Sequence, residues 1–434
     1  MKKELQTYII DFDSTFTQVE ALDELARISQ KKNPNRQLIF DEIDQLTNLA
    51  MEGRLSFTES LEKRVQLLQA NKTHLKQLIK ILKRKVSASF SRNRKFFKDH
   101  SNQVYIFSGG FKDFIIPVVN DYHFLPEHIF ANTFIYDELD NIIGYDTTNP
   151  LSIEGGKVKL LSQLKLPGQL IVIGDGYSDF QMKEAGMIHQ FFAFTENIER
   201  SLVTEKADHI TPSFDEFLYI NKLPMSISYP KNRIAAMVSK TVKTETIEIL
   251  KKEGYAVSVI EDFTIKTIKQ AGILLITDQD EVKNLAINSL PKLKCIGFFG
   301  KVIKSELPIN LCTNSGIVIF DDPNNNPRNP DFIPKRIIKF INGGSTYLSC
   351  NFPNIQLPEI ENAHRLIHIH KNVPGIMAKI NGVLANYDIN ILGQYLRTNQ
   401  SIGYVITDVD LAYNKNVIND LKTIEQTIKF RLLY

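Results

Sequence analysis

Two aspartates separated by one residue, Asp11 and Asp13, directly follow a short apolar run in the stretch TYIIDFDSTF. Two like charges this close are costly unless a positive group lies between them. A divalent cation is one such group, because Mg²⁺ prefers oxygen ligands. The alternative is a solvated turn without chemistry. The rest of the chain decides between these two readings.

Further groups suited to phosphoryl transfer occur along the chain. A carboxylate can attack phosphorus and form an acyl phosphate, and a neighbouring acid can protonate the leaving oxygen. A cation and a fixed Lys can neutralise the phosphate, while amides and a hydroxyl bind its remaining oxygens. The candidates for these roles are Asp11, Asp13, Ser108 with Gly109, Lys157, and Asp175 with Asp179.

Apart from Lys157, these candidates stand at or just after the ends of predicted strands. Three short apolar runs, at 7–11, 104–107 and 170–174, each lead into small or acidic residues and alternate with helical patterns. This alternation predicts a parallel α/β sheet. Residues 40–95 have apolar positions spaced by three and four and are predicted to be helical throughout. Because sites in such sheets lie beyond the carboxyl ends of the strands, the motifs are expected to meet in one crevice.

Two further units follow a plausible linker at 222–233. The segment 231–340 alternates strands and helices and predicts a smaller α/β domain, and the Pro- and Asn-rich stretch 321–334 is predicted to be an irregular boundary. From Arg365 the order is βαββαβ. The predicted domains are therefore 1–222, 231–340 and 362–434.

The composition is that of a soluble globular protein, with 43% hydrophobic and 23% charged residues. With 52 Lys and Arg against 49 Asp and Glu, the net charge is +3, which gives no reason to expect nucleic acid or a membrane as a partner. No apolar run approaches the roughly 20 residues needed to span a bilayer. Three cysteines lie far apart, at Cys295, Cys312 and Cys350, as in a reduced cytoplasmic protein.

The N-terminal half resembles the phosphoserine phosphatases of the haloacid dehalogenase superfamily. The resemblance rests on DFDSTF, AMEGRLSFTESLEKRVQLL, SGGF, GGKVKLL and GDGYSDFQMKEAG, which occur in this order and cover nearly all of residues 7–222. It implies a haloacid-dehalogenase-like sheet with a helical cap at about 18–95. The stretch GDGYSD also mimics a dinucleotide-binding fingerprint, but its sixth position is Asp179 rather than Gly, so that reading fails.

The resemblance implies a role for each candidate. Asp11 would be the nucleophile and Asp13 the general acid and base, and both would contact Mg²⁺ together with Asp175, supported by Asp179. Lys157 would bridge nucleophile and phosphate. The phosphate oxygens would be bound by Ser108 and Gly109.

The resemblance also implies which residues read the substrate. Glu20 would bind its ammonium group and Arg64 its carboxylate, while Met51 and Phe57 would line the closing face of the cap. The alternative for Glu20 and Arg64 is a solvated face of an amphipathic helix. Ser178 stands where relatives have Asn or Thr, which puts one side-chain bond to phosphate in doubt.

The C-terminal region resembles the ACT domain of bacterial D-3-phosphoglycerate dehydrogenases. The match is carried by RLIHIHKNVPG, DINILGQ and the terminal RLLY. It implies L-serine binding between paired copies, with ligands His370, Asn372 and Asn390. The segment 231–340 is similar to part of the dehydrogenase's substrate-binding domain, yet no GxGxxG occurs, so dehydrogenase activity is not expected.

Taken together, the sequence predicts a Mg²⁺-dependent enzyme that hydrolyses O-phospho-L-serine through an aspartyl phosphate and responds to L-serine at its ACT domain. A cytoplasmic homodimer or larger homo-oligomer, without nucleic acid or membrane partners, is expected. Two alternatives stay open: a phosphatase for another small phosphomonoester, and a serine-binding regulator whose phosphatase half is inactive.

Overall fold

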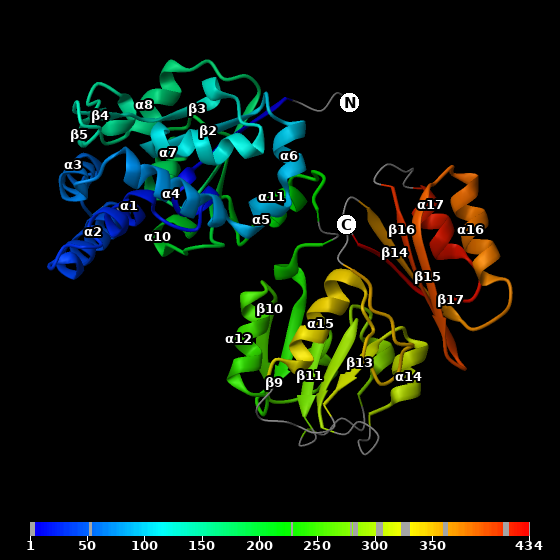
Figure 1. The fold of residues 1–434 in the computed structure, drawn as a ribbon. Helices are drawn as coiled ribbons and strands as arrows, with labels where there is room; N and C mark the ends of the chain where they lie inside the picture. The colour runs from blue at the N-terminus through cyan, green and yellow to red at the C-terminus, as the bar shows by residue number, and fades with distance from the viewer. Residues whose placement is uncertain are drawn as a thin grey trace. The chain divides into compact units, whose positions relative to one another are not determined.

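The chain forms two compact units in a computed structural model, Met1–Ser226 and Ile227–Tyr434. Each unit is described by itself (Figure 1). The structure describes residues 5–51, 54–226, 229–277, 280, 285–300, 307–322, 330–358, 363–410 and 416–433. None of the helices in these ranges is long and apolar enough to cross a membrane.

A six-stranded parallel sheet forms the centre of the first unit, in the order β3-β2-β1-β6-β7-β8. Its inner strands are apolar on both faces, as expected for a parallel sheet covered by helices. This confirms the predicted α/β class. The strands are β1 (Gln6–Ile10), β2 (Val104–Phe111), β3 (Ile129–Asn132), β6 (Gln169–Gly174), β7 (Gln190–Phe194) and β8 (His209–Thr211).

A run of helices between β1 and β2 includes the predicted cap. Ser56 and Asn71 start two of these helices by accepting hydrogen bonds from backbone N–H groups of the first turn. The helices are α1 (Ala21–Ser29), α2 (Arg36–Met51), α3 (Phe57–Leu68), α4 (Lys72–Arg84), α5 (Ala88–Arg92) and α6 (Arg94–Asp99).

The remaining elements of the first unit alternate with the later strands. A hairpin of β4 (Phe134–Tyr136) and β5 (Ile142–Tyr145) pairs antiparallel outside the main sheet. The helices are α7 (Lys112–Val119), α8 (Gly156–Gln163), α9 (Tyr177–Glu184), α10 (Ser201–Thr204) and α11 (Phe214–Ile220).

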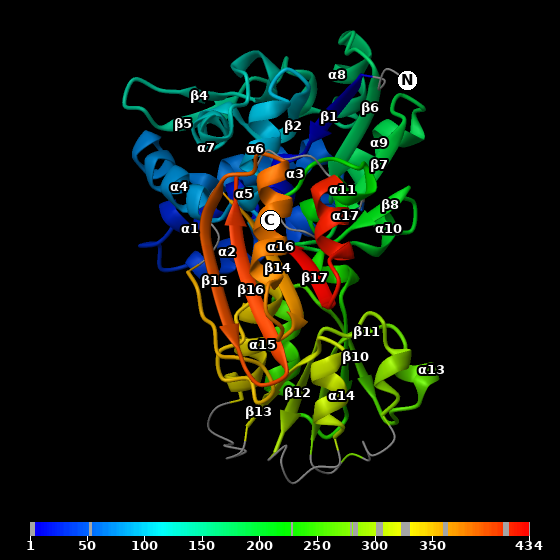
Figure 2. The same ribbon diagram turned by 90° about the vertical axis from the view of Figure 1, so that its right-hand side faces the viewer.

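The second unit contains two sheets, seen in Figure 2. The first is parallel, in the order β10-β9-β11-β12-β13. Its strands are β9 (Ala235–Ser239), β10 (Ala256–Ile260), β11 (Ala271–Thr277), β12 (Cys295–Phe299) and β13 (Val318–Asp321). Its helices are α12 (Thr244–Lys252), α13 (Ile265–Ile268), α14 (Ile309–Asn314) and α15 (Phe332–Gly343).

The other sheet is antiparallel, in the order β15-β16-β14-β17, and has the βαββαβ sequence that the chain pattern predicts. One face of it shares a hydrophobic core with the parallel sheet, so 231–340 and 362–434 lie in one compact unit. The elements are β14 (His364–Lys371), α16 (Ile376–Asn386), β15 (Ile391–Thr398), β16 (Ile402–Val409), α17 (Asn416–Thr423) and β17 (Thr427–Leu433).

The predicted irregular boundary at 321–334 is wrong at both of its ends. β13 runs to Asp321, and α15 begins at Phe332 and packs against β12 and β13. Pro334 is tolerated because it lies in the first turn of α15, where its missing N–H has no intrahelical partner to lose. The part 323–329 lies outside the described residues.

Candidate active site

The candidate nucleophile lies at the carboxyl end of the central strand. β1 pairs in parallel with β6, and the backbone N–H of Asp11 donates to the Ile173 carbonyl at 3.0 Å, which brings the ends of both strands together. After Asp11 the chain turns sharply through Phe12–Phe16, with Ser14 at a φ of 54°. The Asn197 amide donates to the Ser14 carbonyl at 2.9 Å and so holds this turn from another loop.

Lys157 links two of the predicted motifs. From the first turn of α8, its Nζ donates to Oδ1 of Asp11 and to Oδ1 of Asp179, both at 2.7 Å. Burial alone would lower the Lys157 pKa, but the two carboxylates outweigh it and raise the pKa. The side chain is therefore a fixed positive charge beside Asp11.

Asp13 and Asp175 are shielded from solvent, which disfavours their charged forms. Oδ1 of Asp13 accepts from the Ala21 N–H at 2.7 Å, at the start of α1, and burial followed by the nearby Glu20 raises its pKa well above the usual range. Burial raises the pKa of Asp175 to about 8, although Arg200 opposes this. Asp175 also accepts from the Thr15 hydroxyl at 2.7 Å.

The carboxyl end of β2 supplies the predicted phosphate-binding groups. Ser108 is fully buried, and its Oγ accepts from the Gly110 N–H at 2.9 Å. Gly109 lies under the Phe57 ring, since a Cβ placed on Gly109 would be 2.6 Å from Cζ of Phe57. The cap residue Phe57 therefore closes directly over this motif.

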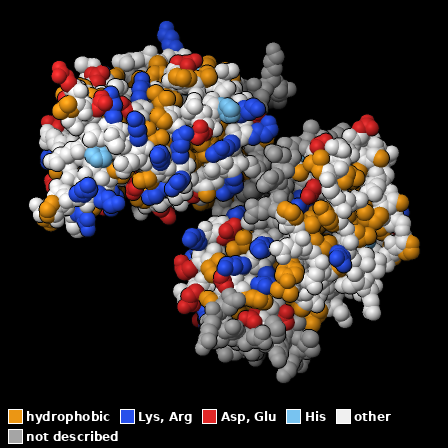
Figure 3. Space-filling view, viewed as in Figure 1, with side chains coloured by type: hydrophobic (Ala, Val, Ile, Leu, Met, Phe, Trp, Pro, Cys, Tyr) orange, Lys and Arg blue, Asp and Glu red, His pale blue; other side chains and the backbone are white. Residues whose placement is uncertain are grey.

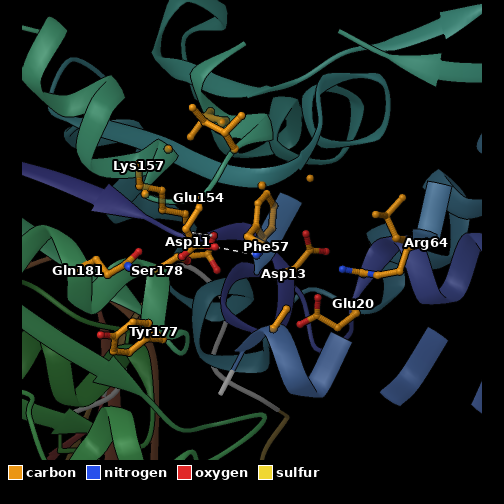
Figure 4. A pocket seen from close by; sticks show the side chains of 18 residues that line it. Asp11, Asp13, Glu20, Phe57, Arg64, Glu154, Lys157, Tyr177, Ser178 and Gln181 are labelled. Carbon is orange, nitrogen blue, oxygen red and sulfur yellow. Dashed lines mark hydrogen bonds and ion pairs between the residues drawn. The ribbon is translucent and has the colours of Figure 1, made fainter. Parts of the chain in front are cut away.

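One pocket joins Asp11, Asp13, Gly109 and Lys157 to the cap (Figure 4), whereas Ser108, Asp175 and Asp179 lie outside its lining. Asp11 and Lys157 lie at one side of it, and the Arg64 guanidinium points into it from the opposite side. Side chains that line the pocket and are labelled in the figure are Asp11, Asp13, Glu20, Phe57, Arg64, Glu154, Lys157, Tyr177, Ser178 and Gln181.

The two predicted substrate-reading residues both line this pocket. Arg64 is only 5% exposed, which excludes a solvated helix face for it. Its NH2 donates to Oδ1 of Asp23 at 2.9 Å, whereas its buried Nε has no hydrogen-bond partner. Glu20 accepts from the Ser14 hydroxyl at 2.7 Å. Met51 is the last residue of α2, and its side chain lies outside the described part of the structure.

Three residues that sequence reasoning missed take part in this arrangement. Arg200 forms an ion pair with Asp175, Asp23 pairs with Arg64, and Glu154 accepts from the Phe57 N–H at 2.7 Å. A lone charged residue in a polar loop or on a helix gives no periodic or motif signal. The roles of Arg200, Asp23 and Glu154 are seen only from their contacts in the folded structure.

The donor set fits a hard divalent cation such as Mg²⁺. Three buried carboxylates, Asp11, Asp175 and Asp179, and the partly buried Asp13 lie near two cations, Lys157 and Arg200. When ionised, the four carboxylates outnumber the two cations. All available ligands are oxygens. Within the described ranges, however, no three His, Cys, Asp or Glu side chains are already gathered as a metal site.

The predicted effector residues do not meet within one chain. His370 is 2% exposed with an unpartnered Nε2, and Asn372 donates to the Asn399 carbonyl at 2.8 Å. Asn390 lies at the other end of the sheet, where its carbonyl accepts from the Asp410 N–H. His370 pairs with Gly403, seven residues from Asp410, so the two ends are roughly 23 Å apart along β16.

Comparison with known proteins finds different relatives for the two parts of the chain. The N-terminal half is similar to phosphoserine phosphatases, and part of the C-terminal region is similar to D-3-phosphoglycerate dehydrogenases and to an ACT domain family. Residues 366–429 match the family described as "AHAS small subunit-like ACT domain".

Particular relatives show how much of each protein is shared. The phosphoserine phosphatase of Drosophila melanogaster is 26% identical over 217 residues, which are 49% of this chain and 77% of that protein. The D-3-phosphoglycerate dehydrogenase of Haemophilus influenzae is 43% identical over 99 residues, which are 23% of this chain and 24% of that protein. The chain therefore spans about a quarter of the length of the dehydrogenases that it matches.

Among solved structures, a phosphoserine phosphohydrolase-like protein from Francisella tularensis is 28% identical. It aligns with a TM-score of 0.45 and covers 50% of this chain and 99% of its own.

Proposed function

We propose that the protein is a Mg²⁺-dependent phosphatase that hydrolyses O-phospho-L-serine to L-serine and phosphate and is regulated by L-serine. One observation carries the proposal: a single pocket is lined by Asp11, Asp13 and Lys157 as well as by the carboxylate of Glu20 and the guanidinium of Arg64. A phosphorylated amino acid needs one set of residues for its phosphate and, beyond it, opposite charges for its ammonium and carboxylate groups. The separated, reduced cysteines fit a cytoplasmic enzyme.

In the proposed reaction, an oxygen of Asp11 attacks phosphorus and the bond from phosphorus to the serine oxygen breaks. Asp13 gives its proton to that leaving oxygen, which its raised pKa favours. Water then attacks phosphorus of the aspartyl phosphate, and Asp13 takes up the water's proton as Asp11 is released. Lys157 keeps Asp11 oriented and offsets the phosphate charge.

The cation would be held by Asp11, the Asp13 backbone carbonyl and Asp175, with Asp179 in support. When bound, it neutralises charge on the nucleophile and on the phosphate. Lys157 and Gly109 bind the phosphate oxygens, with Ser108 alongside. Glu20 receives the substrate ammonium group, and Arg64 receives its carboxylate.

The test is phosphate release from O-phospho-L-serine with MgCl₂, compared between wild type and Asp11→Asn. We expect turnover by wild type, loss of at least about 1000-fold in the variant, and loss in EDTA that MgCl₂ restores. Absence of turnover by folded wild type would contradict the proposal and support an inactive phosphatase half. Preference for a neutral phosphomonoester would support the other alternative.

The proposed effector site is composite. Because His370 and Asn372 lie at one end of the sheet and Asn390 at the other, a small ligand can contact both only across two copies. β15 is an edge strand that exposes Ile391, Leu392, Tyr395 and Leu396. Antiparallel pairing of β15 with the same strand of a second copy would bring the start of one strand beside the end of the other.

A further inference from the structure

Asp23 joins three helices of the cap through one oxygen. It lies on α1, and its Oδ1 accepts from Arg64 on α3 at 2.9 Å and from the Thr47 hydroxyl on α2 at 3.0 Å. Asp23 is 8% exposed and Arg64 is 5% exposed. The pair is therefore buried, unlike most ion pairs on helix surfaces.

The contact leaves part of the Arg64 guanidinium available. This group is planar, with five N–H donors in fixed directions, so holding NH2 also fixes the directions of the others. Nε is buried and has no acceptor among the described residues. A buried donor without a partner is costly, so the guanidinium keeps hydrogen-bonding capacity that its contact with Asp23 does not satisfy.

We infer that Asp23 is a positioning residue that selects for a carboxylate on the substrate by fixing the orientation of Arg64. The inference rests on the proposed function and deepens it. Asp23 does not line the pocket and so acts through Arg64. Thr47 restrains Asp23 in turn, so the chain of contacts runs from α2 through α1 to α3.

A second reading gives Asp23 only a structural role, as the counter-charge that lets Arg64 be buried. The two readings differ in which substrates are affected. A structural role predicts equal losses for every phosphomonoester together with a lower melting temperature. A positioning role predicts a loss confined to substrates that carry the carboxylate.

The experiment compares O-phospho-L-serine with O-phosphoethanolamine, which keeps the phosphate and the ammonium group but lacks the carboxylate. For Asp23→Asn in the full chain with MgCl₂, we expect KM for phosphoserine to rise about 10-fold or more with kcat nearly unchanged. Kinetics with phosphoethanolamine should stay within about 2-fold of wild type. Thr47→Val should also lower the preference for phosphoserine over phosphoethanolamine, measured as the ratio of their kcat/KM values, but by a smaller factor.

Asp44→Asn is the matched control. It removes another Asp–Arg pair of the cap, Arg27–Asp44 at 2.9 Å, which is exposed and does not touch Arg64. We expect no change in the preference between the two substrates. Parallel losses on both substrates in Asp23→Asn, or an unchanged preference, would overturn the inference.

Failure of the proposed function has a different signature. If the proposed function is wrong, the wild-type protein itself will show no preference for phosphoserine over phosphoethanolamine. A wild type that prefers phosphoserine and an Asp23→Asn variant that keeps this preference would leave the proposed function standing and remove only the role of Asp23.

Discussion

At the scale of single residues, Gly109, which we propose to bind phosphate, lies in close contact with the Phe57 ring of the cap. We predict that Gly109→Ala raises KM about 10-fold or more, because the new Cβ would lie 2.6 Å from the Phe57 ring and displace it. Steady-state kinetics with O-phospho-L-serine measure this. Combining Gly109→Ala with Phe57→Leu should recover part of the loss, since Leu lacks the outer ring atoms. No recovery would show that the loss arises elsewhere than at the ring.

Single residues differ in how far the sequence could predict them. Asp11 and Asp175 could be found because each directly follows a strand, and Lys157 because it lies in a motif at the start of a helix. The parallel sheet brings the two strand ends together, and Lys157 contacts Asp11. Arg200 and Asp23 could not be found, because their importance lies in a partner that is distant in sequence. A charged residue on a helix looks the same in sequence whether it faces solvent or a buried guanidinium.

The start of α3 is linked to the loop before α8 by two hydrogen bonds. The Phe57 N–H donates to Oε2 of Glu154 at 2.7 Å, and the Glu154 N–H donates to the Thr58 hydroxyl at 3.1 Å. A carboxylate at a helix N-terminus also interacts favourably with the helix dipole. These reciprocal contacts join α3 to the loop before α8, which carries Lys157.

We predict that Glu154→Ala raises KM for all phosphomonoesters by a similar factor, about 3- to 10-fold, because it weakens closure without touching the substrate-reading residues. The comparison of O-phospho-L-serine with O-phosphoethanolamine measures this. Glu184→Ala on α9 is the control, because the carboxylate of Glu184 is hydrogen-bonded among the described residues only by the Tyr177 hydroxyl, at 3.5 Å. A Glu154→Ala effect on one substrate alone would contradict a role in closure.

β14 contains a histidine that should make stability depend on pH. His368 is 2% exposed, its Nε2 contacts the Thr427 hydroxyl at 2.8 Å, and burial, followed by the nearby His370, lowers its pKa to about 4. Between about pH 6.5 and 4 the unfolded chain binds a proton at His368 that the folded chain does not. Stability contributed by neutral His368 is therefore lost as pH falls through this window, by at most about 3 kcal/mol.

Thermal unfolding of the full chain at pH 7.5 and 5.0 measures this effect. The fall in melting temperature from pH 7.5 to 5.0 should be smaller for His368→Phe than for wild type, because Phe does not titrate. The same fall in both proteins would assign the pH dependence to other groups.

Whole elements could be predicted where periodicity is strong, and not where packing decides. The strands β1, β2 and β6 and the βαββαβ order all follow the pattern of apolar residues. The start of α15 could not be predicted, because local Pro and Asn suggest irregular chain, whereas its apolar face packs against β12 and β13. At the start of α15, packing against the parallel sheet outweighs the low helix propensity of the local sequence.

At the scale of the molecule, the two sheets of the second unit depend on each other. Tyr404 of β16 donates from its hydroxyl to the Gly344 carbonyl at 2.8 Å, and Arg365 of β14 donates to the Gly343 carbonyl at 3.0 Å. Two side chains of the antiparallel sheet thus bind the carboxyl end of α15. The sequence divides these regions into domains because it shows where patterns change, but it does not show which faces share a core.

The proposed composite effector site makes a prediction that only an assembly of two chains can test. His370→Ala and Asn390→Ala should each abolish serine binding when alone. In a heterodimer of the two variants, one of the two sites carries both changes and the other carries neither. Calorimetry should therefore find about one serine per heterodimer, because one intact site is rebuilt from wild-type residues of different chains.

The matched control pairs wild type with the double variant His370→Ala/Asn390→Ala. If each site takes His370 from one chain and Asn390 from the other, both sites of this heterodimer are damaged and serine should not bind. If each site lies within a single chain, the wild-type chain keeps one intact site. The control heterodimer would then bind about one serine, and the heterodimer of the two single variants would bind none. The roughly 23 Å between the two ends of β16 favours the first outcome, since no single serine can span that distance.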